Sequence, residues 1–156
     1  DKKQSEKRRL DMNISTILNQ KPVSGVAWIT PDATVTDALA LLADKGIGTL
    51  VVSQDGSKPD GILSERDIVR ALARKGSMEM MSRVDSIMTD DPVTCTPEED
   101  SSNVLGKMSQ GRFRHMPVVD AGGALVGLVS IGDIVKARMT DLEYEHGVLV
   151  DMIAGR

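Results

Sequence analysis

Two short motifs carry the most specific chemistry in this chain. Each reads Gly-apolar-apolar-Ser-x-x-Asp, once from Gly61 to Asp67 and once from Gly127 to Asp133. If the serine begins a helix, its hydroxyl and the free N–H groups of the first turn can bind a phosphate. The aspartate lies one turn further on the same side, where its carboxylate can accept from two adjacent hydroxyls. Each motif therefore suits a ligand that carries a phosphate and a ribose.

The same spacing has a second interpretation that needs no ligand. In a capping box, the side chain of Ser64 or Ser130 accepts the N–H of the aspartate, and the aspartate accepts the N–H of the serine. One isolated copy would favour the cap. Two copies, each after Gly-apolar-apolar, favour a nucleotide site. Both can hold in part, because an unliganded helix still needs a cap.

The motifs belong to a longer internal repeat. Thr30-Pro31 recurs as Thr96-Pro97 and Ser64 as Ser130, each 66 residues later (96 − 30 and 130 − 64). A constant offset indicates one supersecondary unit used twice, with the copies packed about a pseudo-two-fold axis. Two ligand half-sites would then face each other.

The residue patterns predict the order β-α-β-β-α in both copies, and hence an α+β fold. In the first copy we expect a strand at 26–29, a helix after a capping box at Thr34, strands at 49–52 and 61–63, and a helix from Ser64 to about Gly76. In the second copy we expect a strand at 93–95, a helix around 104–108, strands at 116–119 and 125–129, and a helix from Ser130.

A short apolar segment leads into each copy. Ile14–Leu18 is echoed at Val84–Met88 at an offset of 70, so the first copy carries four extra residues (70 − 66) between Leu18 and Thr30. Lys21 lies in or beside this insertion and is a candidate for a phosphate contact; the alternative is an exposed surface lysine. The chain then divides into a polar tail (1–12), a first repeat (13–77), a connector (78–83), a second repeat (84–140) and a C-terminal helical extension (141–156).

The last predicted helix carries apolar residues seven apart. They form two sets, which are Val135, Leu142 and Leu149, and Met139, His146 and Ile153. This spacing predicts a seam that packs on a second subunit rather than on its own domain, although Gly147 weakens it. Only three residues of 156 are aromatic, so two thin cores of aliphatic side chains also favour a homodimer.

Bulk composition excludes several classes of function. A net charge of −4 gives no general attraction to nucleic acid or to an anionic membrane. The basic residues among the first nine are diluted by Asp1 and Glu6, and read as a solvated tail. The single Cys95 excludes an internal disulfide and suits a reducing compartment. With no long apolar stretch and no signal-peptide pattern, we expect a soluble cytoplasmic protein. The sequence begins with Asp, which leaves room for a segment upstream.

The repeat resembles a tandem pair of cystathionine-β-synthase (CBS) domains, also called a Bateman module. The similar stretches are Gly61-Ile-Leu-Ser-Glu-Arg-Asp67-Ile, Gly127-Leu-Val-Ser-Ile-Gly-Asp133-Ile and Arg114-His-Met-Pro-Val-Val119. The resemblance covers about Ile14 to Thr140, and we therefore expect a stand-alone module. It implies binding of an adenosyl ligand, which is AMP, ADP, ATP, S-adenosylmethionine or NAD(H).

The resemblance also implies roles for individual residues. It assigns ribose to Asp67 and Asp133, and phosphate to Ser64 and Ser130. It places adenine against the first and second strands of each copy. In the first copy the residues are Thr30, Gly48, Thr49 and Leu50, and in the second copy they are Cys95, Thr96, His115, Met116 and Pro117. Met116 and Cys95 are also ordinary core residues of a strand, and that alternative stays open.

The charges near the motifs differ between the copies. Arg66 lies in the first helical turn, where a cation opposes the helix dipole and a bound phosphate would reverse the effect. Its alternative role is an ion pair with Glu65 or Asp67. The second copy has Gly132 there, and its nearby basic residues are Arg112, Arg114 and His115. We therefore expect two sites of unequal affinity.

Three classes of function compete. The first is a sensor in which ligand binding changes the packing of the pair or dimer, which a regulated partner reads. The second is a dimerisation module without ligand, against which the intact serines and aspartates argue. The third is an enzyme, but the sequence holds only two histidines and no metal-ligand cluster, phosphate-binding Gly-x-x-x-x-Gly-Lys loop or nucleophile elbow. We expect no catalytic residues and no metal.

Overall fold

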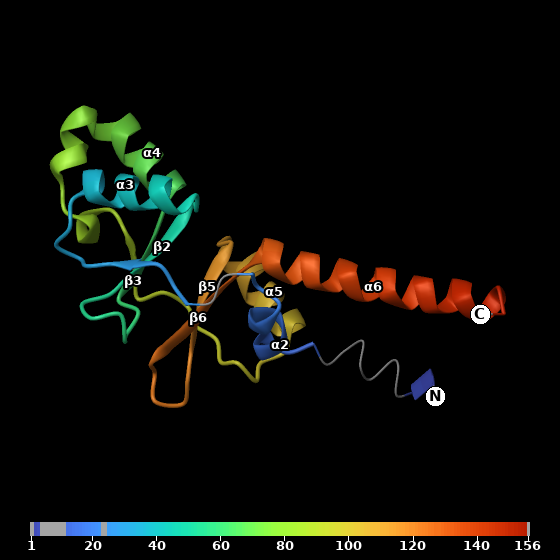
Figure 1. Cartoon of the computed structure of the whole chain (residues 1–156). Helices are drawn as coiled ribbons and strands as arrows, with labels where there is room; N and C mark the ends of the chain where they lie inside the picture. Colours follow the sequence, from blue (N-terminus) through green and yellow to red (C-terminus); the bar gives the residue numbers. More distant parts are fainter. Residues whose placement is uncertain (1, 4–11, 23–24, 156) are drawn as a thin grey trace. The chain divides into compact units, whose positions relative to one another are not determined.

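The computed structural model describes residues 2–3, 12–22 and 25–155 and is a mixed α+β structure, as predicted (Figure 1). Its contacts define two compact units. Unit 1 comprises the described part of 1–24 with 98–114 and 129–156, and unit 2 comprises 25–97 and 115–128. The predicted polar tail lies almost wholly outside the described residues. Each unit takes segments from both repeats of the sequence.

Unit 2 contains a four-stranded sheet in the order β1-β2-β3-β4, followed along the chain by a two-stranded hairpin, β5-β6. Strand β2 is parallel to β1 and antiparallel to β3, and β3 is antiparallel to β4. The elements are β1 (Trp28–Ile29), α3 (Val35–Lys45), β2 (Thr49–Val52), β3 (Gly61–Ser64), α4 (Glu65–Lys75), the 3-10 helices η1 (Ser77–Met81) and η2 (Val84–Ser86), β4 (Thr89–Asp90), β5 (His115–Val119) and β6 (Leu125–Ser130).

Helices α3 and α4 contribute to one hydrophobic core with the sheet. Leu50 of β2 and Leu63 of β3 face each other in the register of the sheet, and both are fully buried. The helices add Val35, Ala38, Leu42 and Ile68 to the same cluster. Burial of these aliphatic side chains stabilises unit 2 and fixes the ends of β3 and α4 that carry the first motif.

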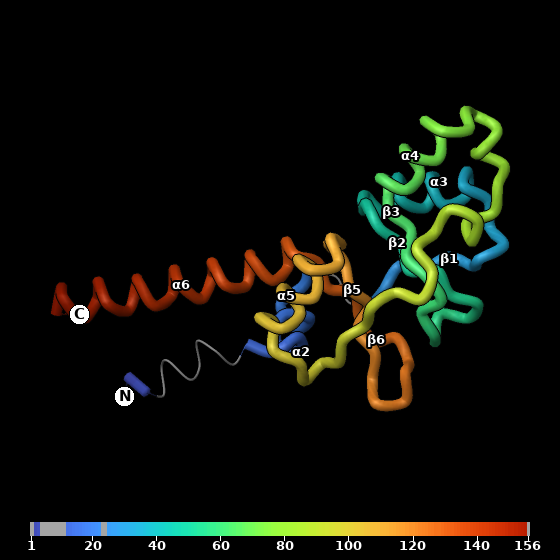
Figure 2. Tube along the Cα trace, turned by 180° about the vertical axis from the view of Figure 1, so that it is seen from behind, coloured from blue at the N-terminus to red at the C-terminus, as the bar shows by residue number. Residues whose placement is uncertain are grey.

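Unit 1 consists of helices. Its elements are α2 (Ile14–Asn19), α5 (Ser101–Gly111) and α6 (Ile131–Ile153). The buried residues are Ile14, Ile17, Ser101, Val104, Met108, Val129 at the end of β6, Ile134 and Ala137. They include only two residues of α6, both near its start, and the helix continues well beyond α2 and α5 (Figure 2).

The helix boundaries follow the predicted caps. Thr34 caps α3, Ser64 caps α4 and Ser130 caps α6, each through a complete capping box. Helix α3 ends at Gly46, whose φ of 62° is left-handed and suits a residue without Cβ. The predicted capping residues therefore place the starts of three helices correctly.

One strand prediction was wrong, and one was confirmed only in part. Residues 93–95 form no strand; Cys95 alone makes an isolated parallel bridge to Val118. Val93 is 48% exposed, whereas Cys95 is buried, so only one residue of the segment is held at the strand β5. The strand expected at 26–29 is reduced to Trp28–Ile29. The structure adds β4, whose two exposed residues pair with β3 and give no hydrophobic pattern for sequence reasoning to detect.

The segment leading into the second repeat completes the first repeat's core. The N–H of Val84 donates to the carbonyl of Ala33 at 2.8 Å, and the N–H of Val35 donates to the carbonyl of Ser82 at 3.0 Å. Val84 is fully buried in the core of unit 2. The second bond also satisfies one of the free N–H groups at the start of α3.

The segment leading into the first repeat does the same for the second. The N–H of Ile14 donates to the carbonyl of Glu99 at 3.0 Å, and the N–H of Ser101 donates to the carbonyl of Met12 at 2.9 Å. By the offsets of 66 and 70, these are the same four positions. The two repeats have therefore exchanged their leading segments.

We predict that the exchanged segment is essential to the stability of unit 2. Val84→Ala should lower the free energy of unfolding by about 1.5–3 kcal/mol, because it removes fully buried apolar surface. Val69→Ala is the matched control, since Val69 is 64% exposed, and it should change little. Urea denaturation of both variants checks this. Equal losses would show that Val84 is not a core residue.

Candidate ligand-binding sites

The first motif forms a compact hydrogen-bonded box at the start of α4. The N–H of Ser64 donates to Oδ2 of Asp67 at 2.8 Å, and its hydroxyl donates to the same oxygen at 2.9 Å. The N–H of Asp67 donates to Oγ of Ser64 at 3.3 Å. These bonds all use Oδ2, so the cap leaves Oδ1 of the carboxylate for another donor. Cap and ligand site are therefore compatible.

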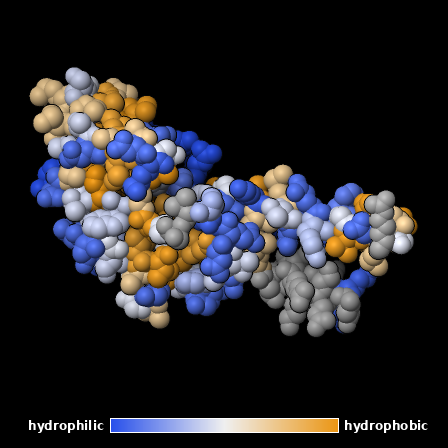
Figure 3. Space-filling model, in the orientation of Figure 1, coloured by the Kyte–Doolittle hydropathy of each residue, from blue (hydrophilic) through white to orange (hydrophobic). Residues whose placement is uncertain are grey.

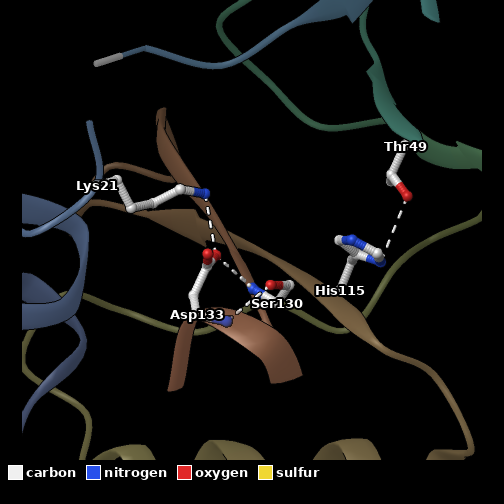
Figure 4. A network of polar contacts seen from close by, with 5 residues as sticks. All are labelled: Lys21, Thr49, His115, Ser130 and Asp133. Atoms are coloured by element: carbon white, nitrogen blue, oxygen red, sulfur yellow. Dashed lines mark hydrogen bonds and ion pairs between the residues drawn. The ribbon is translucent and has the colours of Figure 1, made fainter. Parts of the chain in front are cut away.

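The second motif forms the same box and adds a cation. The N–H of Asp133 donates to Oγ of Ser130 at 3.0 Å, and the N–H of Ser130 donates to Oδ2 of Asp133 at 3.0 Å. Nζ of Lys21 also donates to Oδ2 of Asp133 at 3.0 Å (Figure 4). The side chains of Lys21 and Asp133 are 32% and 24% exposed, which makes this a partly screened ion pair. No local pattern in the sequence predicts this contact, since the two residues lie 112 positions apart.

This environment changes the pKa of Asp133. Burial raises the pKa of the carboxyl, but hydrogen bonds from Lys21 and from the backbone of Ser130, with the positive charge of Lys21, outweigh it. The pKa of Asp133 is therefore lower in the folded chain than its ordinary value. The carboxylate is held ionised and ready to accept hydrogen bonds.

The other candidates of the first copy lie in different environments. The carbonyl of Thr30 accepts the N–H of Ala33 in a turn after β1, and the carbonyl of Gly48 accepts the N–H of Glu65 at the start of α4. Leu50 is fully buried in the core. Arg66 is exposed and makes no ion pair with any residue the structure describes. The alternative role of Arg66 as a partner of Glu65 or Asp67 is not observed.

In the second copy, Cys95, Met116 and Pro117 are buried, with Sγ of Cys95 3.9 Å from the carbonyl of Pro117. Met116 and Cys95 are thus buried, as the core alternative predicts. Thr96 is half-buried. Arg112 is the exposed left-handed C-cap of α5, with a φ of 57°.

Arg114 takes the place of Gly48 in the second copy. Its carbonyl accepts the N–H of Ile131 at 2.9 Å, which is the counterpart of the bond from Glu65 to Gly48 at an offset of 66 (114 − 48 and 131 − 65). The Arg114 residue is exposed. Both motifs therefore hold the start of their helix against the residue before the second strand of the same copy.

Two of the predicted adenine residues contact each other. Oγ1 of Thr49 lies 3.4 Å from Nδ1 of His115, and both residues belong to unit 2 (Figure 4). They occupy the same position in the two copies, since 115 − 49 is 66. A contact between equivalent positions is what packing about a pseudo-two-fold axis produces.

The described residues offer no other chemistry of comparable specificity. No group of three or more His, Cys, Asp or Glu side chains among them could hold a metal ion. None of the helices in the described ranges has the length and hydropathy of a membrane span. The capping boxes and their neighbours remain the candidate sites.

A family model of the CBS domain matches residues 14–74 and again residues 84–140. The chain belongs to the CBS-domain family. The mitochondrial CBS domain-containing protein CBSX3 of Arabidopsis thaliana is 37% identical to this CBS pair over 114 residues, or 70% of this chain and 55% of that protein. The pair thus spans about half the length of that relative.

Solved structures of other CBS proteins have the same fold. The CBS-domain protein ATU1752 of Agrobacterium tumefaciens has a TM-score of 0.76 at 34% identity, covering 83% of this chain and 95% of that one. The CBS protein PAE2072 of Pyrobaculum aerophilum, complexed with AMP, has a TM-score of 0.70 at 26% identity, covering 83% and 99%. The CBS pair of MJ0100, in complex with 5′-methylthioadenosine and S-adenosylmethionine, has a TM-score of 0.70 at 25% identity, covering 81% and 98%.

We predict that the Lys21–Asp133 pair makes stability depend on pH. A carboxylate whose pKa is lowered by folding stabilises the fold above its unfolded pKa of about 3.9, and that contribution is lost as the pH falls through the folded pKa. Lys21→Met should cost up to about 1 kcal/mol at pH 7, the range of a partly exposed pair. The difference from the wild type should shrink as the pH is lowered towards about 2, because Asp133 becomes protonated as the pH falls through its folded pKa.

Urea denaturation at the two pH values measures this. Lys58→Met is the control, because Lys58 is exposed in the β2–β3 turn. A Lys21→Met deficit that persists undiminished in acid would mean that Lys21 acts through packing and not through the ion pair.

Proposed function

We propose that this CBS pair is a regulatory module that binds an adenosyl ligand at its two Ser-Asp boxes. The observation that carries the proposal is a Ser-Asp box at the end of a Gly-apolar-apolar strand in both copies, a context that the box of Thr34 and Asp37 lacks. Each aspartate of these two boxes is fixed by hydrogen bonds to Oδ2 alone, which leaves Oδ1 directed to no donor among the described residues. A ribose hydroxyl is a donor of the right kind. The adenosyl ligands of PAE2072 and MJ0100 support the same class of ligand.

Each box has a cation that suits a phosphate, but from a different element. Arg66 lies in the first turn of α4, beside the box of Asp67, and is exposed. Lys21 follows α2 and reaches Asp133. Residues 88–95, the stretch of the second copy that corresponds to Lys21, hold no basic residue. The two proposed sites therefore differ in the basic residue available to a phosphate group.

At the second site, Lys21 can exchange its partner when a ligand binds. Without ligand its ammonium neutralises Asp133. A nucleotide brings ribose hydroxyls to the carboxylate and a phosphate that competes for the ammonium. Lys21 would then move from Asp133 to the phosphate, so that binding replaces one charge pair with another instead of leaving a buried charge alone.

The identity of the ligand and the assembly are finer parts of the proposal. AMP, with ADP or ATP, is the first candidate, followed by NAD(H) and S-adenosylmethionine. Thermal unfolding with each would rank them, since a ligand at a hundred times its Kd adds about 2.7 kcal/mol. We infer a non-catalytic cytoplasmic homodimer whose packing responds to the ligand and is read by a regulated protein. The alternative is a dimerisation module without ligand.

The aspartates should matter more for binding than for folding. Asp133→Ala should weaken AMP at the second site by about 1.5–3 kcal/mol, the range for a hydrogen bond to a charged group, and lower stability by about 1 kcal/mol or less as a lost cap. Asp67→Ala should do the same at the first site and leave the second largely unaffected. Calorimetric titration of the folded variants measures both affinities.

Helix α3 supplies a matched control for this experiment. Asp37 forms the same box with Thr34, at 3.1 and 3.2 Å, but follows no Gly-apolar-apolar strand. Asp37→Ala should therefore lose a cap and keep both AMP affinities. Wild-type affinities in Asp67→Ala and Asp133→Ala would leave only the capping role and favour the ligand-free alternative.

The exchange of Lys21 predicts a change in ligand preference. Lys21→Met should weaken the binding of AMP, because the phosphate loses its contact with Lys21. It should not weaken the binding of adenosine, which has no phosphate. The ratio of AMP to adenosine affinity at the second site should therefore fall about tenfold, the size of one charge-assisted hydrogen bond. Competition titrations with AMP and adenosine measure this ratio. An unchanged ratio would place the phosphate elsewhere.

A further inference from the structure

The outer part of α6 is a helix without a core. Ile134 and Ala137 are its buried residues, and both lie in the first two turns. From Met139 to Gly155 every residue is exposed except the half-buried Glu145. Orange, hydrophobic residues are visible at the far end of this helix (Figure 3). A helix of this kind gains little stability by itself and requires a packing surface.

The exposed apolar residues follow a coiled-coil spacing. One stripe of α6 consists of Val135, Met139, Leu142, His146, Leu149 and Ile153. Its members are spaced alternately four and three residues apart. Their exposure includes 57% for Met139, 59% for Leu142 and 56% for Leu149. At about 100° per residue the stripe lies on a different side of α6 from Ile134 and Ala137. It can therefore pack on another helix while α6 keeps its place in unit 1.

We propose that this stripe pairs with the α6 of a second copy as a parallel, in-register two-stranded coiled coil over residues 135–153. The pairing rests on the homodimer of the proposed function and on no ligand. Met139, His146 and Ile153 occupy the a positions, and Val135, Leu142 and Leu149 the d positions. Val150 and Met152 flank the seam at e and g and widen its apolar surface.

The charged residues that flank the stripe favour the parallel orientation of the two helices. In a parallel pair a g residue faces the e residue five positions later on the other helix. Arg138 then faces Glu143 of the second copy, and Glu145 faces Val150, so no like charges meet. An antiparallel pair with the same stripe in full overlap centres on position 144. It brings Glu143 against Glu143 and Glu145 against Glu145.

Arg138 and His146 refine this arrangement. Nη2 of Arg138 donates to the hydroxyls of Ser101 and Ser102 at 3.1 and 2.6 Å, which holds the guanidinium against the start of α5. His146 is the one polar residue of the stripe. In register it meets His146 of the second copy, whereas a slip of one heptad sets it against Met139 or Ile153. A single polar a residue is a recognised way to fix register.

Sedimentation velocity of the full chain at micromolar concentration tests the interface. The wild type should be a dimer, and Leu142→Glu with Leu149→Glu should raise its Kd about a hundredfold or more, because each charge enters the seam twice. Tyr144→Glu with Val148→Glu is the matched control. These residues are 73% and 40% exposed on the same helix but lie outside the stripe, so this variant should remain dimeric.

Disulfide trapping tests the orientation in a Cys95→Ala background. Met139→Cys should cross-link two chains on mild oxidation, since a residues meet in a parallel pair. The antiparallel pair separates these positions by about 15 Å along the axis, too far for a disulfide. Thr140→Cys, on the outer face, is the control and should not cross-link.

The outcomes are distinct. A monomeric wild type, or a dimer that tolerates Glu at 142 and 149, overturns the α6 interface. A dimer that needs both leucines but does not cross-link through position 139 overturns the parallel orientation. Calorimetric titration with AMP is a separate readout, so failure of nucleotide binding leaves the sedimentation result standing.

Discussion

The exchange of leading segments is the constraint on which the rest of this structure depends. Each repeat begins its first helix with N–H groups that have no partner within the helix, and each receives a backbone carbonyl from the other repeat's segment, that of Ser82 or Met12. The same segments insert Val84 and Ile14 into the two cores, where both are fully buried. Each repeat therefore completes its core, and satisfies one further N–H of its first helix, with a segment that leads into the other repeat. The internal duplication is therefore an interdependent pair and not two domains in series.

The exchange also makes the two boxes chemically unequal. Helix α2 belongs to the first repeat by sequence but packs in unit 1, so the residues after it reach the second motif. Lys21 is among them, and its ammonium donates a hydrogen bond to Asp133. Asp67 receives no such cation, and the only basic residue in the first turn of its helix is Arg66. The two motifs are nearly identical in sequence, but only the second lies beside the inserted residue Lys21. Their electrostatic environments therefore differ.

Sequence reasoning succeeds here where structure is local. The boxes at Thr34, Ser64 and Ser130 and the strands expected at 49–52 and 61–63 follow from cap residues and hydrophobic pattern. It fails where the partner is remote. Periodicity identifies an apolar segment at Ile14, but not which helix it will cover. Nor can it predict β4, whose two residues are exposed and held only by pairing with β3. The contact of Lys21 with Asp133 depends on the exchange, and no local pattern encodes the exchange.

The capping box and the proposed ligand site reinforce each other. Holding Ser64 N–H and Oγ on one carboxylate oxygen fixes the rotamer of Asp67 before any ligand arrives, so binding need not order that side chain. The same bonds keep the first turn of α4 intact, which maintains the N–H groups that would face a phosphate. A cap that used both oxygens would leave neither of them wholly available to a ribose hydroxyl. Because the box concentrates its bonds on Oδ2, the element that begins the helix can also serve as the recognition site.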